Sequence, residues 1–104
     1  MNYGRGIEAA RTRQGISKRR LAALVGVDPS YITHLEAGKK TPSLPVVEKI
    51  ATALEVPVYV LMLMSSDDGD LKGVDATEAG ELARRLLDLL PAGEREDPDA
   101  DSDA

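Results

Sequence analysis

Residues 18–37 constrain the fold of this chain most, because they have the spacing of two short helices joined by a tight turn. Ala22 is small where the two helices must approach closely, and Gly26 lies in the turn, where a positive φ costs glycine little. Apolar side chains fall where such a pair would face the rest of a domain: Leu21, Val25, Val27, Ile32 and Leu35. This arrangement can hold one helix out from the body as a probe, so the segment predicts a helix-turn-helix.

Start and stop signals divide residues 1–64 into five short helices. Each signal is a polar side chain that can cap a first turn, or a glycine or proline at a helix end. The signals are Gly15, Ser17, Gly26, Asp28-Pro29, Gly38, Ser43 and Pro57. Apolar residues recur at helical spacing between them, and the chain has neither strand-like alternation nor an internal repeat. An all-α fold is therefore expected, with residues 1–64 as its main domain.

Three further segments follow this domain. Residues 65–75 are rich in Ser, Asp and Gly and are expected to form a linker. Residues 76–90 have an apolar stripe at helical spacing and predict a sixth, amphipathic helix. Residues 91–104 are acidic and nearly without large apolar side chains, so a disordered tail is expected.

Charge is distributed very unevenly along the chain, whose net charge is −5. Residues 1–64 contain nine Lys and Arg against five Asp and Glu, a net charge of +4. Residues 65–104 contain four against thirteen, a net charge of −9. This asymmetry indicates a basic working module followed by an acidic appendage.

Several functional classes are disfavoured by the composition. The chain has no Cys and a single His, His34, so neither a disulfide nor a metal site with the usual ligands is expected. No nucleophile–base pair and no phosphate-cradling glycine loop is visible, so neither an enzyme nor a cofactor is expected. The first residues lack the apolar core of a secretion signal, and the apolar run 56–64 is too short to cross a bilayer. A cytoplasmic location is the expectation.

Residues 5–63 resemble the Cro/C1-type helix-turn-helix family, also called the XRE family. The matching residues are Ile7, Arg11, Arg13, Gly15-Ile16-Ser17, Leu21-Ala22, Gly26-Val27, Ile32, Leu35-Glu36, Gly38, Pro42, Leu44, Ile50-Ala51 and Leu54. The resemblance implies a five-helix domain whose third helix enters the major groove of double-stranded DNA. It also implies an ion pair between Arg11 and Glu36 that braces the first helix against the third, since a partly buried charge needs a partner.

Carried over by position, the resemblance assigns base contacts to four residues of the third helix: Ser30, Tyr31, Thr33 and His34. The backbone phosphates would be contacted at both ends of the motif, by Ser17, Lys18, Arg19, Lys39, Lys40 and Thr41. Two alternatives stay open: His34 is equally compatible with a solvent-facing role, and Tyr31 with packing on the backbone. The chain departs from the family pattern at Pro29, which replaces a residue that is often polar and in contact with a base.

Two apolar segments exceed what one core needs. The run 58–64 is apolar nearly all round, and an isolated amphipathic helix at 76–90 must bury its stripe on something. We expect both to form a homodimer interface through Tyr59, Met62, Leu63, Leu82, Leu86 and Leu89. The alternative is that the helix at 76–90 folds back on its own domain.

The resulting functional expectation is a sequence-specific transcriptional regulator, a repressor that acts as a homodimer on a palindromic operator. The alternative is an antitoxin, or another interaction protein whose C-terminal segment binds a partner protein. For the acidic tail, the simple interpretation is a solubilising end. A sharper hypothesis is that it competes with DNA for the basic face.

Overall fold

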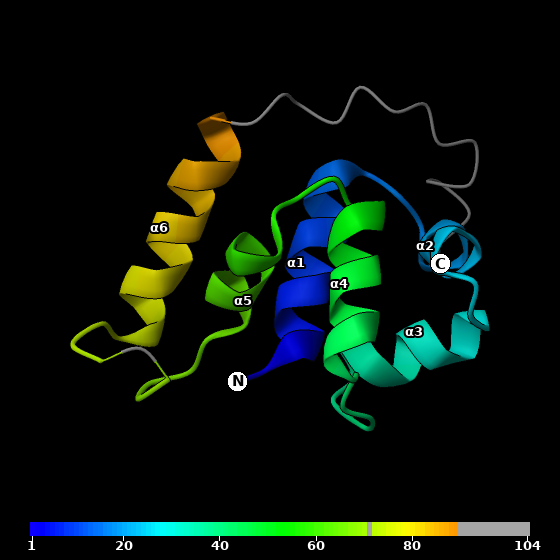
Figure 1. The fold of residues 1–104 in the computed structure, drawn as a ribbon, viewed down its shortest axis with the longest axis horizontal. Coiled ribbons are helices and arrows are strands. Elements are labelled where there is room, and N and C mark those ends of the chain that lie inside the picture. The colour runs from blue at the N-terminus through cyan, green and yellow to red at the C-terminus, as the bar shows by residue number, and fades with distance from the viewer. Residues whose placement is uncertain (71, 90–104) are drawn as a thin grey trace.

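The computed structural model describes residues 1–70 and 72–89, which form six helices and no β-strand (Figure 1). The helices are α1 (Tyr3–Gln14), α2 (Lys18–Val25), α3 (Pro29–Glu36), α4 (Leu44–Ala53), α5 (Val58–Ser65) and α6 (Ala76–Leu89). The all-α prediction is confirmed. Leu90 and the predicted tail at 91–104 lie outside the described residues.

The predicted capping residues define the helix boundaries. Ser17, Asp28 and Ser43 precede α2, α3 and α4, and each side chain accepts a hydrogen bond from a backbone N–H of the first turn. Gly15 and Gly26 end α1 and α2 in the left-handed conformation, with φ of 70° and 85°. Local signals in the sequence therefore determine where each short helix of the motif begins and ends.

One apolar core lies among the six helices, and α1 passes through its middle. Helix α5 packs against α1, α4 and α6 and separates α1 from α6 in Figure 1, while α2 packs against both α3 and α4. The completely buried large side chains come from the first five helices and the turn after α4: Ile7, Leu21, Ile32, Leu35, Val47, Ile50, Leu54, Val60 and Leu61. This core fixes α2 and α3 to the body and leaves their outer faces exposed.

Two glycines in α1 allow its neighbours to approach unusually closely. A Cβ atom on Gly4 would lie 2.2 Å from the backbone oxygen of Leu35, and one on Gly6 would lie 1.9 Å from Oγ of Ser65. The first turn of α1 is therefore pressed against the end of α3 on one side and the end of α5 on the other. This role of Gly4 and Gly6 could not be predicted from the sequence, because it depends on residues distant in the chain.

The start of the predicted linker belongs to the packed body. Ser65 ends α5 and is completely buried, and Ser66 is 2% exposed. Their hydroxyls donate to the carbonyl oxygens of Leu61 and Met62, which satisfies buried polar groups that water cannot reach. The segment that links α5 to α6 outside the packed body is therefore shorter than the predicted linker at 65–75.

Helix α6 folds back on its own domain and packs against α5. It is attached through Ala79, Ala83 and Leu87, whereas Leu82 and Leu89 are 46% and 82% exposed. The apolar stripe expected on this helix comprised Ala79, Leu82, Ala83, Leu86, Leu89 and Leu90. Ala79 and Ala83 are buried as expected, but Leu87 is buried in place of Leu82 and Leu89, because the small alanines allow α6 to lie close to α5. Of the six residues expected at a dimer interface, Leu63 and Leu86 partly pack on this core and Tyr59 is 59% exposed.

Candidate nucleic-acid interface

Helix α3 is anchored along one edge and exposed along the other. Ile32 and Leu35 are completely buried, while Ser30 and Thr33 are exposed on the outer side. Tyr31 and His34 are half-buried at the borders between these two edges. The structure therefore gathers the four residues predicted to contact bases on or beside the accessible face of one helix.

The hydroxyls of Ser30 and Thr33 already have acceptors within the helix. Oγ of Ser30 donates to Oδ1 of Asp28 at 2.7 Å, and Oγ1 of Thr33 donates to the carbonyl oxygen of Pro29 at 3.3 Å. The two Ser30 donors, first its hydroxyl and then its backbone N–H, hold the pKa of Asp28 below its ordinary value. With their protons used in this way, both hydroxyls present lone pairs outward and are suited to accept hydrogen bonds.

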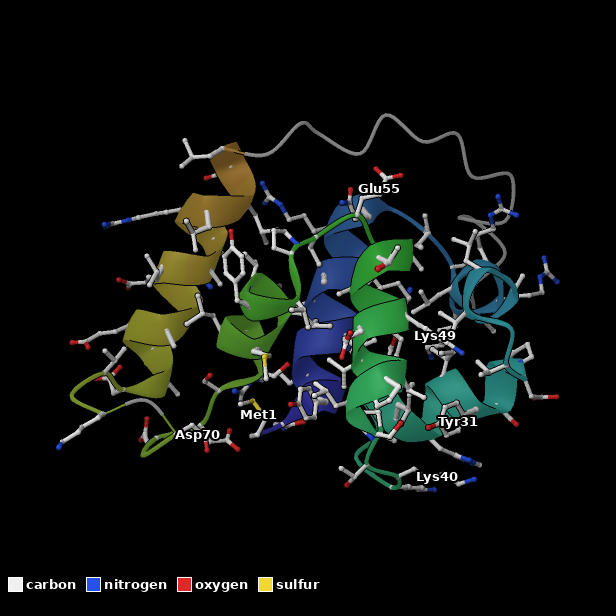
Figure 2. The ribbon with its side chains drawn as sticks, viewed as in Figure 1. Met1, Tyr31, Lys40, Lys49, Glu55 and Asp70 are labelled. Atoms are coloured by element: carbon white, nitrogen blue, oxygen red, sulfur yellow. The ribbon has the colours of Figure 1, made fainter. Side chains whose placement is uncertain are left out.

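Tyr31 connects α3 to the basic loop that follows it. Its ring packs partly against the core, and Nζ of Lys40 lies 5.6 Å from the ring centroid, within range of a cation–π contact (Figure 2). The backbone N–H groups of Lys39 and Lys40 donate to the carbonyl oxygen of His34, which holds the loop against the end of α3. The sequence analysis missed the Tyr31–Lys40 contact, although the two residue types alone are compatible with it.

At the other end of the motif, Lys18 and Arg19 begin α2, with Lys18 half-buried and Arg19 exposed. The phosphate contact predicted for Ser17 is wrong, because that residue is completely buried and its Oγ accepts the N–H of Arg20 at 2.8 Å. A residue without exposed surface cannot touch a phosphate. Ser17 caps α2, and the side chains accessible to a phosphate at this end of the motif are those of Lys18 and Arg19.

The pair implied for Arg11 and Glu36 is present and well shielded from solvent. Nε of Arg11 lies 2.7 Å from Oε2 of Glu36, and a second hydrogen bond of 3.1 Å joins the guanidinium to Oε1. The side chains are 11% and 3% exposed, and the guanidinium also donates to the carbonyl oxygen of Ile16. Two parallel bonds of this kind fix direction as well as distance, so the pair locks the end of α3 to α1.

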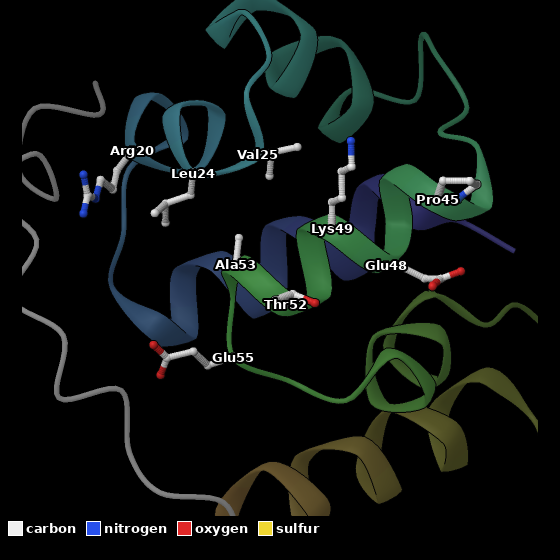
Figure 3. A pocket seen from close by; sticks show the side chains of 9 residues that line it. All are labelled: Arg20, Leu24, Val25, Pro45, Glu48, Lys49, Thr52, Ala53 and Glu55. Atoms are coloured by element: carbon white, nitrogen blue, oxygen red, sulfur yellow. The ribbon is translucent and has the colours of Figure 1, made fainter.

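A groove between α2 and α4 lies next to the motif (Figure 3). It is lined by Arg20, Leu24, Val25, Pro45, Glu48, Lys49, Thr52, Ala53 and Glu55. In Figure 3, Lys49 extends from α4 toward α3, while Glu48 and Glu55 point away from it. Lys49 thus adds a positive charge to the side of the molecule where α3 is exposed, a contribution that the sequence analysis did not assign.

Residues 1–70 and 72–89 were considered for a metal site and for a membrane-spanning helix because each would point to a different function. No group of three or more His, Cys, Asp or Glu side chains there could hold a metal ion. No helix in the same ranges is both long and apolar enough to span a membrane.

A helix-turn-helix family model matches residues 7–61, more than half of the chain. The chain belongs to this family. It is 30% identical over 87 residues to the transcriptional regulator ClgR of Mycobacterium tuberculosis, a match that covers 84% of this chain and 68% of ClgR. The family resemblance inferred from the sequence is therefore confirmed.

Two solved structures extend the comparison to three dimensions. The clp gene regulator ClgR from C. glutamicum matches with a TM-score of 0.60 and 26% identity, over 62% of this chain and 83% of that one. The restriction-modification controller protein C.AhdI from Aeromonas hydrophila matches with a TM-score of 0.55 and 37% identity, over 58% and 91%. These relatives are regulators and not enzymes, and the chain is accordingly a DNA-binding transcriptional regulator of the XRE type.

Proposed function

We propose that this helix-turn-helix regulator is a repressor that binds a palindromic operator as a homodimer, with α3 of each subunit in the major groove. The observation that carries the proposal is the outer edge of α3, which exposes the hydroxyls of Ser30 and Thr33 and has lysines near both ends of the motif. A helix of this kind fits the width of the major groove, and two copies about 34 Å apart would contact one face of the duplex.

Base recognition falls to the outer residues of α3. The lone pairs of Ser30 and Thr33 suit the amino groups of adenine and cytosine, because their own protons are directed at Asp28 and Pro29. His34 borders the same edge and supplies an imidazole, and Tyr31 supplies a hydroxyl and apolar ring surface. Pro29 contributes no donor, so the leading end of the helix makes fewer base contacts than is usual in this family.

Phosphate contacts fall to the residues that flank α3 in space. Lys18 and Arg19 lie at the start of α2, where the positive end of the helix also favours an anion. Lys39, Lys40 and Thr41 follow α3 and are all exposed. These groups would supply affinity that is independent of sequence and decreases with salt.

The homodimer is supported by the apolar surface of α5 and α6. Helix α6 buries only one of its faces against α5. Leu82 and Leu89 on its remaining surface, and Tyr59 of α5, stay strongly exposed. Exposed leucines on an otherwise polar helix are typical of an association surface. We assign the interface to these residues together with Met62, Leu63 and Leu86.

Repression follows from the geometry of such a dimer. Two recognition helices one turn of DNA apart would cover the duplex between the half-sites and exclude polymerase from any overlapping promoter. The test is transcription in vitro from a promoter that contains the selected operator. Repression predicts that transcript falls as the regulator occupies its site, whereas a rise would identify an activator.

The decisive experiment is selection of bound fragments from random duplex DNA by the full chain. We expect an inverted repeat with half-sites about one helical turn apart. A single unrepeated site would contradict the homodimer, and the absence of any enrichment, together with no DNA shift at low salt, would contradict the function itself.

Matched substitutions then separate the two kinds of contact. Lys40→Ala is expected to weaken binding to all sequences alike and to lower the salt slope by about 1, while Thr33→Ala relaxes preference at one operator position. Lys72→Ala removes one exposed positive charge from the segment before α6 and serves as the control for net charge. Equal effects of Lys40→Ala and Lys72→Ala would remove Lys40 from the proposed contacts.

The exposed leucines of α6 would also serve a partner protein, as in an antitoxin. Purification from the native host distinguishes the two assignments. A stoichiometric second protein that dissociates when Leu82 is changed would favour the partner, and a homodimer alone favours the proposal above.

A further inference from the structure

The positive charges of the described residues fall into two groups. Arg5 and Arg13 lie 3.1 Å and 2.5 Å from carboxylate oxygens of Asp67 and Asp88, and Arg11 is paired with Glu36. In contrast, no carboxylate of residues 1–70 or 72–89 forms an ion pair with the lysines of α2, α4 and the loop after α3. These lysines are Lys18, Lys39, Lys40 and Lys49. Lys72, Arg84 and Arg85 also form no ion pair among the described residues, but residues 72–89 hold four Asp and Glu against these three cations. The unpaired cations that are in excess over nearby acids are therefore those on and around the proposed DNA-binding face.

The same chain carries a concentrated negative charge. Residues 91–104 contain six Asp and Glu and one Arg, a net charge of −5, with no large apolar side chain. A segment of this composition has little to bury in an apolar groove, and its binding partner must be a positively charged surface. Charge complementarity therefore matches this segment to the four lysines, hereafter the lysine face.

We propose that residues 91–104 bind the lysine face when DNA is absent, so that DNA must displace them. The inference rests on the proposed function, because it takes the lysine face to be the surface that contacts phosphates. The acidic segment acts as an intramolecular mimic of the DNA backbone.

The chain is long enough for this contact. Helix α6 ends at Leu89, and the 15 residues from 90 to 104 can span at most about 50 Å when extended. The longest principal extent of the molecule is 40 Å, so the extended segment is comparable in length with the molecule itself. A segment tethered at this distance has an effective concentration in the millimolar range, which makes a weak contact effective.

The contact would remain reversible. Exposed ion pairs are individually weak and are screened by salt, so the segment exchanges readily with a phosphate backbone. Competition at one surface lowers the affinity for all DNA by the same factor. Its consequence is that fewer molecules stay on random DNA, while an operator that adds base contacts remains occupied.

The test compares three full-length chains on a random-sequence duplex. One is the natural chain, one has the six acids of residues 91–104 replaced by Asn or Gln, and one has residues 91–104 shuffled with their charge retained. At about 50 mM salt we expect the neutral-tail chain to bind about 3- to 10-fold more tightly than the other two, with the gap closing near 200 mM. Equal binding by all three chains at low salt would overturn the proposal.

A second measurement distinguishes direct contact from a change in net charge. Without DNA, backbone amide NMR signals of the lysine face are expected to differ between the natural and neutral-tail chains, whereas signals around Arg5 and Arg13 stay unchanged. Tighter DNA binding without changes at the lysine face, or changes confined to Arg5 and Arg13, would overturn the contact. If no chain binds any DNA, the proposed function fails, and these signals alone decide whether the segment contacts the lysines.

Discussion

Helices α3 and α6 are attached to the molecule in similar ways but expose opposite kinds of surface. Each is held by a narrow buried stripe, Ile32 and Leu35 in α3 and Ala79, Ala83 and Leu87 in α6. Beside its stripe, α3 exposes polar side chains with lysines nearby, whereas α6 exposes Leu82 and Leu89 in addition to its charged residues. Similar anchoring in the core therefore does not determine which side chains a helix exposes to a partner. The exposed surface of α3 suits a polyanion, and that of α6 suits an apolar partner.

The two helices also differ in how firmly they are anchored. The Arg11–Glu36 pair at the end of α3 is almost fully shielded, while the Arg13–Asp88 pair at the end of α6 has side chains 43% and 67% exposed. Removing one partner of a shielded pair leaves an uncompensated charge, whereas exposed pairs contribute little. The following predictions test this contrast.

The largest effect is expected for Glu36→Ala. It leaves the Arg11 guanidinium shielded without its carboxylate, and we expect a loss of about 3 to 5 kcal/mol in the free energy of unfolding. Asp88→Ala is the matched variant at α6 and is expected to cost less than about 1 kcal/mol. Urea unfolding measures both, and similar losses at the two sites would contradict the proposed difference in anchoring.

Alanine is expected to destabilise the protein at Gly4 of α1, which packs against α3, and to stabilise it at Gly80 of α6. Gly4→Ala would bring a Cβ atom within 2.2 Å of the Leu35 backbone oxygen, so α1 must move from α3, at a cost of about 1 to 3 kcal/mol. Gly80→Ala in α6 meets only the end of the Arg84 side chain, at 3.6 Å, and should stabilise by about 0.5 to 1 kcal/mol. Thermal unfolding of both variants gives the signs, and a stable Gly4→Ala chain would disprove the close approach.

The leucine surface is tested by Leu82→Glu. Leu82 is 46% exposed, so the substitution changes the folded subunit little, but it puts a charge into the proposed interface. We expect the dimer dissociation constant to rise at least about 10-fold, a loss of about 1.4 kcal/mol. Glu81→Gln, which changes an exposed residue about 100° around α6 from Leu82, is the control in sedimentation experiments. An unchanged association would exclude Leu82 from the interface and leave only the other leucines to be tested.

The helix boundaries around α3 could be predicted from sequence because they depend on local chemistry. Asp28-Pro29 and Ser43 cap a helix wherever they occur, and glycines end one at little cost. The Arg11–Glu36 pair was predicted only through the family resemblance, since the two residues are 25 positions apart. The base and phosphate contacts stay predictions, and the hydrogen bonds that occupy the hydroxyls of Ser30 and Thr33 were not predicted.

The errors have a common physical origin in tertiary packing. Leucines cover a wide arc of α6, and which of them is buried depends on how closely Ala79 and Ala83 let it approach α5. The roles of Gly4 and Gly6 likewise depend on backbone atoms of α3 and α5. Ser17 was assigned to the phosphates by its position in the family pattern, yet its side chain caps α2 and is buried. Periodicity identifies a helix, but only its neighbours fix its orientation.

The smallest effect is expected at the helix starts, where pH separates the two regions. The pKa of Asp28 is lowered from 3.8 by the Ser30 hydroxyl and N–H, so its carboxylate stabilises the folded state above that pH. This contribution is lost as pH falls through the lowered folded-state pKa of Asp28.

The test is the variant Asp28→Asn, in which the amide oxygen still accepts the Ser30 N–H but does not titrate. The melting temperature of this variant should therefore approach or exceed that of the natural chain between about pH 5 and pH 2. Asp75→Asn makes the same change at α6, where the aspartate accepts the N–H of Glu78 at 2.8 Å. Thermal unfolding of both variants across this pH range gives the melting temperatures. If the difference in melting temperature between the natural chain and Asp28→Asn does not change with pH, the Asp28–Ser30 bonds do not depend on the charge of Asp28.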